Sequence, residues 1–321
     1  MGVTTVYGHS HLRAAVAQKV VGAWAARLGR PAPKVVAGES TPLGTHMPVW
    51  HTGFEGHEIL PPEEVAALMR RSDFVVENGL APGTRHDAAR FIVEQVRARP
   101  GEVTLACIGA LSNVATALRL DPGIAPLVRR IVFMGTGSRL RAAPDGLSRL
   151  PMAGPKEPVV PGRGVPWLHY PNLNIVGDTL AAVRVFESGI PVDVVGDTVT
   201  NQLWWGAPDE ASASECRALR EAREPAESAV VGQLLDVWLR YRTVIFGRPV
   251  AGTCPHDPLT VAEAIYPRRF LQFSAPGHLL VHEWAGFSTF VCGAGGPHRL
   301  ARTVDAGGFL ELLGRRLVPR Y

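Results

Sequence analysis

The chain has 321 residues, of which 46% are hydrophobic and 19% are charged. This apolar content excludes a disordered chain and is enough for the core of one large domain spanning residues 1–321. The 33 basic residues include only the lysines at positions 19, 34 and 156, and the excess of four positive charges is scattered. Without a concentrated basic stripe, we expect no nucleic-acid partner.

The apolar runs, the N-terminal residues and the cysteine spacing indicate the cellular compartment of the protein. No run approaches the roughly 20 apolar residues of a membrane span, and residues 1–6 lack the basic stretch and apolar block of a secretion signal. The four cysteines lie far apart, without CxxC spacing, at Cys107, Cys216, Cys254 and Cys292. We therefore expect a cytoplasmic protein with no membrane partner, no disulfide framework and no zinc site.

Short apolar runs alternate with amphipathic stretches along the first two thirds of the chain. The pattern predicts, in order, a strand at 2–6, a helix at 11–28, a strand at 34–37, a helix at 84–99, a strand at 103–108, a helix at 111–120, a strand at 131–134, a helix at 178–188 and a strand at 192–195. Continuous apolar strands between helices indicate an α/β fold, with a mostly parallel open sheet, helices on both faces and a Rossmann-like core.

The last third is predicted to add helices at 229–246, 255–266 and 305–317, and antiparallel strands at 270–284 and 287–292. Residues 41–62 and 135–171 are predicted to be long loops, the second because it carries prolines at positions 144, 151, 155, 158, 161 and 166. Long loops often form lids or site walls. His51, Glu55 and His57 in the first loop lack zinc spacing on a defined element, so solvated lid histidines are the favoured interpretation.

The segment Pro255-His256-Asp257-Pro258 is the first candidate for chemistry. An aspartate at a helix start most often caps the helix, and this alternative has about equal weight. In the functional alternative, Asp257 is a carboxylate ligand for a hard cation and His256 gives a proton to a leaving group.

Three further segments combine polar residues with predicted strand or helix ends. Ser112 or Asn113 caps the helix at 111–120, or a carbonyl of this turn serves as an oxygen ligand. Asn172 and Asn174 are either turn formers or paired amides that hold vicinal hydroxyls. His9 follows the first strand, where this architecture places ligand-facing residues, although a surface histidine is the simpler interpretation. These features together indicate an enzyme with a ligand-binding cleft, but they do not identify the reaction that it catalyses.

Several segments, in matching order and spacing, resemble the inosine–uridine-preferring nucleoside hydrolase family. They are residues 2–8, 50–56, 103–117, 130–135, 172–199 and 256–259. The resemblance covers nearly the whole chain and implies hydrolysis of the N-glycosidic bond of a ribonucleoside, with a bound calcium ion that binds ribose hydroxyls and orients the attacking water. It also implies a small nucleoside-like ligand and a homo-oligomer.

Residue by residue, the resemblance assigns calcium binding to Asp257 and to the backbone carbonyl of Ser112. It places His256 beside the leaving base and Asn174 on the ribose. His9 stands where the family has a ribose-contacting asparagine, and Asn172 stands where it has a sugar-contacting glutamate. Both are therefore expected to contact the sugar.

The family's aspartate cluster, Asp-x-Asp-x-x-x-Asp-Asp, has no counterpart in the chain, which begins just before the family's second strand. Asp257 and one carbonyl are too few for calcium, which takes 6–8 oxygen ligands. Either the start codon is placed too late, so that an edge of the sheet is left bare, or the fold has been reused. The alternatives are a hydrolase with reduced or altered activity, a non-catalytic ligand-binding relative, or a metal-independent ribosyl-processing enzyme of a biosynthetic pathway.

Overall fold

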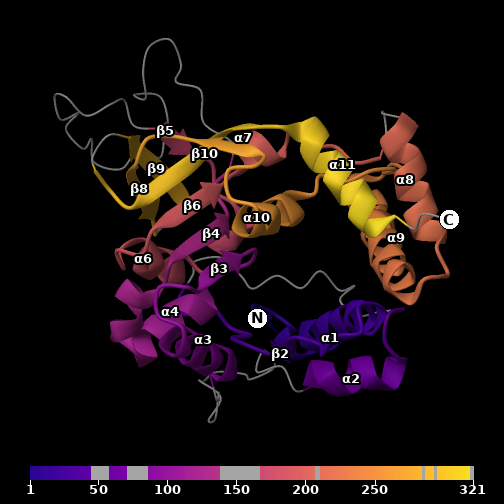
Figure 1. The fold of residues 1–321 in the computed structure, drawn as a ribbon, viewed down its shortest axis with the longest axis horizontal. Coiled ribbons are helices and arrows are strands. Elements are labelled where there is room, and N and C mark those ends of the chain that lie inside the picture. The colour runs from indigo at the N-terminus through magenta and orange to yellow at the C-terminus, as the bar shows by residue number, and fades with distance from the viewer. Residues whose placement is uncertain are drawn as a thin grey trace.

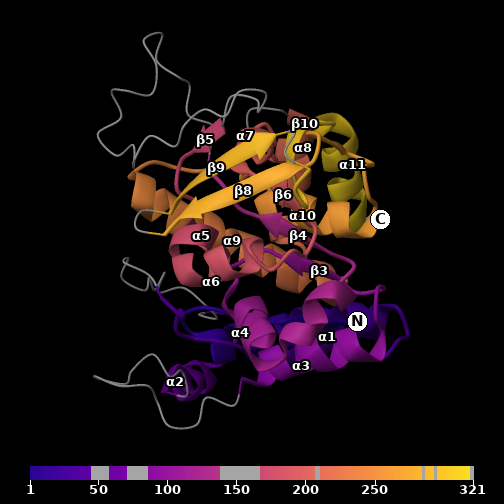
Figure 2. The ribbon, with the colours of Figure 1, turned by 90° about the vertical axis from the view of Figure 1, so that its left-hand side faces the viewer.

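The computed structural model describes residues 1–44, 58–70, 86–137, 167–206, 210–283, 286–292 and 295–318. Within these ranges, a large sheet lies between helices (Figures 1 and 2), with the strand order β3-β4-β6-β10-β8-β9-β5 and with β7 paired to β10. The predicted α/β class is confirmed. His51, Glu55, His57 and most of the two predicted loops lie outside the described residues.

The first half of the sheet is parallel. It consists of β3 (Thr104–Cys107), β4 (Arg130–Met134), β6 (Val192–Val195) and β10 (His298–Val304). The first three were predicted from their apolar residues, and β4 and β6 are almost entirely buried, whereas β3 is only partly buried. Helices connect them, chiefly α4 (Ser112–Leu120), α5 (Leu173–Val176) and α6 (Thr179–Phe186).

The second half of the sheet is antiparallel, so the whole sheet is mixed rather than mostly parallel. It consists of β7 (Leu271–Phe273), β8 (Gly277–His282), β9 (Phe287–Cys292) and β5 (Trp167–His169). The expectation of a loop throughout 135–171 is wrong at its end, where β5 pairs with β9. The prediction also missed β10, whose sequence HRLARTV carries two arginines among its apolar residues.

Helices cover both faces, as predicted, because neighbouring strand residues point to opposite sides. On β4, Phe133 packs in the cluster with α3 (Asp87–Ala98), α4 and α6, whereas Val132 packs in a second cluster. The second cluster draws on the other face's helices, α8 (Glu210–Glu221), α9 (Ala226–Phe246), α10 (His256–Ile265) and α11 (Ala306–Leu317). Of these, α8 was not predicted.

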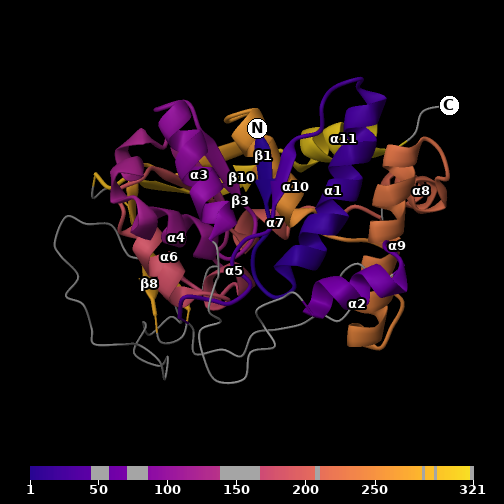
Figure 3. The ribbon, with the colours of Figure 1, turned by 90° about the horizontal axis from the view of Figure 1, so that it is seen from below.

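The N-terminal residues form a separate parallel pair, β1 (Gly2–Thr4) and β2 (Lys34–Val36), joined by α1 (Ser10–Arg27). The helix α2 (Pro62–Arg70), also unpredicted, packs on α1. Figure 3 shows β1 between β3 and α1. Asn113 of α4 links this unit to the large sheet: its Oδ1 accepts from the Glu39 amide at 2.9 Å and its Nδ2 donates to the Thr5 carbonyl at 2.9 Å.

Candidate functional site

The candidate site is built around three segments: the helix α5 after β5, the helix α7 (Asp197–Thr200) after β6, and the start of α10, which follows α9. Asn174 donates from Nδ2 to the carbonyl of Met134, the last residue of β4, at 2.8 Å. The segment therefore lies at the carboxyl end of the parallel strands, where open α/β sheets bind their ligands.

The side-chain amide of Asn172 forms hydrogen bonds through both its oxygen and its nitrogen. Its Oδ1 accepts from the Asn174 backbone amide at 2.9 Å and thereby caps α5, while its Nδ2 donates to Asp197 Oδ1 at 3.3 Å. This cap is a local backbone role that neither interpretation of the asparagine pair, turn former or sugar-binding amide, had specified. Contact of either amide with a sugar remains a prediction.

The short helix α7 connects the α5 segment to α10. Asp197 at its first position binds Asn172, and Thr200 at its last position places Oγ1 2.7 Å from His256 Nδ1. Three residues of α-helix rise about 4.5 Å, so α7 fixes the asparagine segment and the histidine at short range. Because Nδ1 is engaged by Thr200, the other ring nitrogen, Nε2, is the one available to a ligand.

Charges of both signs act on His256. Burial is the main cause that lowers its pKa below the ordinary histidine value, and the positive charge of Arg242 acts in the same direction. The carboxylate of Asp197 partly offsets both effects. Burial also raises the pKa of Asp197, against the opposing influence of His256 and of the Asn172 hydrogen bond.

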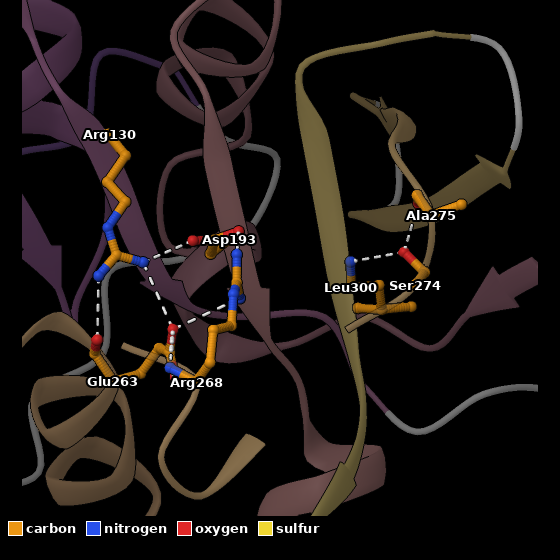
Figure 4. Close-up of polar contacts among 7 residues, drawn as sticks. All are labelled: Arg130, Asp193, Glu263, Arg268, Ser274, Ala275 and Leu300. Atoms are coloured by element: carbon orange, nitrogen blue, oxygen red, sulfur yellow. Dashed lines mark hydrogen bonds and ion pairs between the residues drawn. The ribbon is translucent and has the colours of Figure 1, made fainter. Parts of the chain in front are cut away.

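A buried ion cluster anchors α10 to the sheet (Figure 4). Arg130 of β4 lies 2.6 Å from Asp193 of β6 and 3.4 Å from Glu263 of α10. Arg268, just beyond α10, lies 2.9 Å from Asp193, and its backbone amide donates to Glu263 at 3.0 Å. The two carboxylates balance the charge of the two guanidinium groups. Their ion pairs tie α10, the helix that begins with His256, to β4 and β6.

Neither Ser112 nor Asn113 caps α4, so the capping interpretation of that turn is wrong. Ser112 is fully buried and its hydroxyl donates to Asp178 Oδ2 at 2.6 Å. Asp178 also accepts from the backbone amides of Leu43, Gly44 and Ala181. Residues 43–44, α4 and α6 therefore meet at one carboxylate. Calcium binding by the Ser112 carbonyl stays a prediction.

The strand end that carries His9 adjoins the same region. His9 precedes α1 and is 7% exposed, so the interpretation as a surface histidine is wrong. The Tyr7 ring lies beside Gly177, where a Cβ atom would meet it at 3.3 Å. The end of β1 therefore lies next to α5, and contact of His9 with a sugar stays a prediction.

Asp257 is the second residue of α10 but makes no capping hydrogen bond, so the capping interpretation fails here as well. Burial raises its pKa to about 6, and no hydrogen-bond or ion-pair partner occurs for it in the described ranges. A buried carboxylate without a partner suits a cation ligand.

The described residues nevertheless do not fit a complete calcium site. Calcium takes 6–8 oxygen ligands, whereas the described part of the chain contains no group of three or more His, Cys, Asp or Glu side chains arranged to hold a metal. Asp257 and the Ser112 carbonyl supply at most three oxygens. The calcium prediction therefore stays a prediction, and the chemistry below is derived from the protein's own side chains.

Sequence reasoning missed Asp178, Asp197 and Thr200. Asp197 follows the apolar strand β6 after a single glycine, so the strand-end rule that selected His9 would also have selected it. Asp178 and Thr200 carry no such signal, because their roles come from contacts with Ser112 and His256 that are distant in the sequence.

These features define an α/β protein with a cluster of polar residues at the carboxyl ends of its parallel strands, where proteins of this class bind ligands. The model of the inosine-uridine preferring nucleoside hydrolase family matches residues 1–311. The chain belongs to this family of N-glycosidases. No helix in the described ranges has both the length and the apolar character needed to cross a bilayer.

Similar proteins differ in the bases that their names indicate. Uridine nucleosidase 1 of Arabidopsis thaliana is 26% identical over 99% of this chain and 85% of its own length. Probable uridine nucleosidase 2 of the same plant is 27% identical, but over only 56% of this chain and 46% of its own length. The structure of a purine-preferring ribonucleoside hydrolase from Gardnerella vaginalis superposes with a TM-score of 0.64 at 21% identity, over 98% of this chain and 89% of that one.

The raised pKa of Asp257 predicts a specific pH dependence of stability. The unfolded carboxyl titrates near pH 3.9 and the folded one near 6. As the pH rises between these values, the folded state keeps a proton that the unfolded state has lost, so stability falls. Asp257→Asn removes this penalty, so we expect its gain in unfolding free energy over wild type to grow by about 2–3 kcal/mol from about pH 4 to pH 7.

Urea unfolding of both proteins at the two pH values measures this difference, and contributions from all other groups cancel. An equal gain at both pH values would contradict the burial of an ionised Asp257. Added calcium at about pH 7 tests the ligand role separately, because a bound cation stabilises wild type selectively.

Proposed function

We propose that this protein hydrolyses the N-glycosidic bond of a ribonucleoside or a related ribosyl compound. The observation that carries the proposal is the bridge formed by α7, which binds Asn172 through Asp197 and His256 through Thr200. A proton donor for a leaving base and polar groups for a sugar are thereby held on one rigid connection. Family membership over residues 1–311 supports this reaction class.

In the proposed reaction, the polar groups of α5 and α7 hold the sugar, with its anomeric carbon toward His256. The oxygen of water bonds to the anomeric carbon as the bond from that carbon to the base nitrogen breaks, and the electron pair leaves with the base. His256 donates its Nε2 proton to the departing base, which avoids expulsion of a free anion. The water oxygen, as it bonds to the anomeric carbon, releases one proton to the surrounding water, and His256 takes a proton back from solvent before the next cycle. The products are the free base and the free sugar.

The base preference is not carried over, because relatives named for uridine and for purine nucleosides match this chain with similar identity. We propose a small-molecule ligand as the partner. The homo-oligomeric state, the cytoplasmic location and the absence of nucleic-acid binding stay predictions from the sequence.

The test is release of free base from a panel of purine and pyrimidine ribonucleosides, separated by chromatography, first with calcium and then with a chelator. We expect release of base together with an equal amount of ribose. Release only with calcium would show that donors beyond those identified here complete a metal site. Release under both conditions would favour metal-independent chemistry.

Binding measured by calorimetry separates the alternative functions. A protein that binds a nucleoside in both conditions but releases no base would contradict the hydrolase proposal and support a non-catalytic ligand-binding role. A protein that neither binds nor cleaves any member of the panel would contradict both.

A further inference from the structure

We propose that Asp197 is a direct substrate-binding residue, whose carboxylate accepts a hydrogen bond from a hydroxyl of the ribose. The inference rests on the proposed function and deepens it, because it assigns the sugar subsite to a group on α7 in addition to the asparagines of α5. Asp197 belongs to neither the helix that carries His256 nor the segment that carries Asn172.

The hydrogen bonds of Asp197 leave one of its oxygens available. Oδ1 accepts from Asn172 Nδ2 at 3.3 Å. Within the described part of the chain, Oδ2 has no hydrogen-bond partner, and Asp197 pairs with no arginine or lysine. An ionised carboxylate has about four acceptor sites and no donor, so its unfilled sites require N–H or O–H groups from outside.

Burial makes this unfilled oxygen significant. Asp197 is only partly exposed, and burial raises its pKa more than His256 and Asn172 lower it. The protein has therefore not fully compensated the charge of this carboxylate. A half-buried carboxylate that forms no ion pair with arginine or lysine in the described residues is costly for the fold, and a ligand that donates hydrogen bonds offsets this cost.

The polar groups around Asp197 suit a neutral hydrogen-bond donor of the ligand, such as a sugar hydroxyl. Asn172 is bound to Asp197, and Thr200, three residues further along the same helix, is bound to His256. A hydroxyl near Oδ2 would belong to a sugar whose leaving group lies toward His256. Carboxylates and amides together match hydroxyls, because the carboxylate accepts and the amide both donates and accepts.

The alternative is that Asp197 acts only by holding Asn172 in place. In that case its replacement would weaken all ligands equally, because no hydroxyl of the ligand contacts it. A direct contact instead predicts that the loss is confined to ligands that carry the contacted hydroxyl. Analogues that lack one hydroxyl each can therefore separate a direct contact from a positioning role.

The experiment measures binding by calorimetry in a His256→Ala background, so that turnover does not consume the ligand. The ligands are the best-bound ribonucleoside and its 2′-, 3′- and 5′-deoxy analogues. We expect one analogue to bind about 10- to 100-fold more weakly than the ribonucleoside, the effect of one lost hydrogen bond to a charged group. With Asp197→Ala added, the ribonucleoside should weaken by the same factor and that analogue should no longer differ from it.

Two further variants control for structural effects. Asp197→Asn keeps an oxygen that can accept from Asn172, so it should preserve the thermal unfolding midpoint while weakening the ribonucleoside. Asp236→Asn removes a carboxylate on α9 that pairs with Arg220 and Arg240, outside the site, and should leave all four affinities unchanged.

Persistent discrimination between ribonucleoside and analogue in the Asp197→Ala background would overturn the inference while the hydrolase proposal stands. So would an equal loss for all four ligands. Failure of the unmodified protein to bind or cleave any nucleoside would instead overturn the proposed function, and this inference with it.

Discussion

Replacement of His256 by alanine is expected to lower the kcat for base release by about 10²- to 10⁴-fold, the usual contribution of a positioned general acid. The physical reason is the geometry of the ring: Thr200 engages Nδ1 at 2.7 Å, which directs Nε2 to the leaving group. Nucleoside binding should change much less, because the sugar contacts are assigned to other residues. Steady-state kinetics and calorimetry on the same preparation measure the two effects separately.

The pH profile gives an independent signature of this role. An acid must carry its proton to act, so kcat falls as the pH rises through the pKa of His256. Burial and Arg242 hold that pKa below the ordinary histidine value, so the fall should begin at unusually low pH. The His256→Ala variant should no longer show this fall of kcat with pH. The control is His282, a histidine on β8 that pairs with Thr289; its replacement by alanine should change neither kcat nor the pH profile. Full turnover by His256→Ala would refute the acid role.

The second large effect is expected on stability, from replacement of Glu263 by alanine. Glu263 is 1% exposed and contributes one of the two negative charges that balance Arg130 and Arg268. Its removal leaves Asp193 as the one carboxylate of the cluster opposite the largely buried Arg130 and the more exposed Arg268, and breaking one partner of a buried ion pair costs about 3–5 kcal/mol. Urea unfolding followed by tryptophan fluorescence should show this loss.

The matched control is Glu311→Ala, a glutamate on α11 that forms an exposed ion pair with Arg315. Exposed pairs of this kind contribute little, so its unfolding midpoint should equal that of wild type. Because the cluster fixes α10, Glu263→Ala should also reduce turnover at temperatures where the protein remains folded. An unchanged unfolding midpoint for Glu263→Ala would show that the cluster does not hold α10.

Local pattern was sufficient for the elements that depend on their own residues. The valine-rich segment at 192–195 is a strand with the predicted bounds, and the helix predicted at 111–120 begins one residue later, at Ser112. These two element predictions succeeded because strand and helix patterns depend on neighbouring residues. The strand-end rule also selected His9, whose contact with a sugar stays a prediction.

The local sequence pattern did not predict the features that depend on contacts between distant segments. The strand β10 carries two arginines and became strand only because β6, β7 and β8 pair with it. One interpretation of the turn was that Ser112 or Asn113 caps the helix, but their side chains bond to Asp178 and to the backbone at Glu39, far away in the sequence. The same residue types, serine and asparagine, serve as helix caps and as hydrogen-bond partners of distant segments, so the sequence alone does not distinguish the two roles.

For this protein, the sequence by itself determined the α/β class, the family and the residue types at the strand ends, because these follow from short-range periodicity and motif spacing. The tertiary structure alone decided which polar groups meet: Asp197 with Asn172, and Thr200 with His256. It also decided the buried state of Asp257, which sets its pKa. Hydrogen bonds and burial between distant segments depend on packing, and packing is fixed only when the whole sheet and its helices assemble.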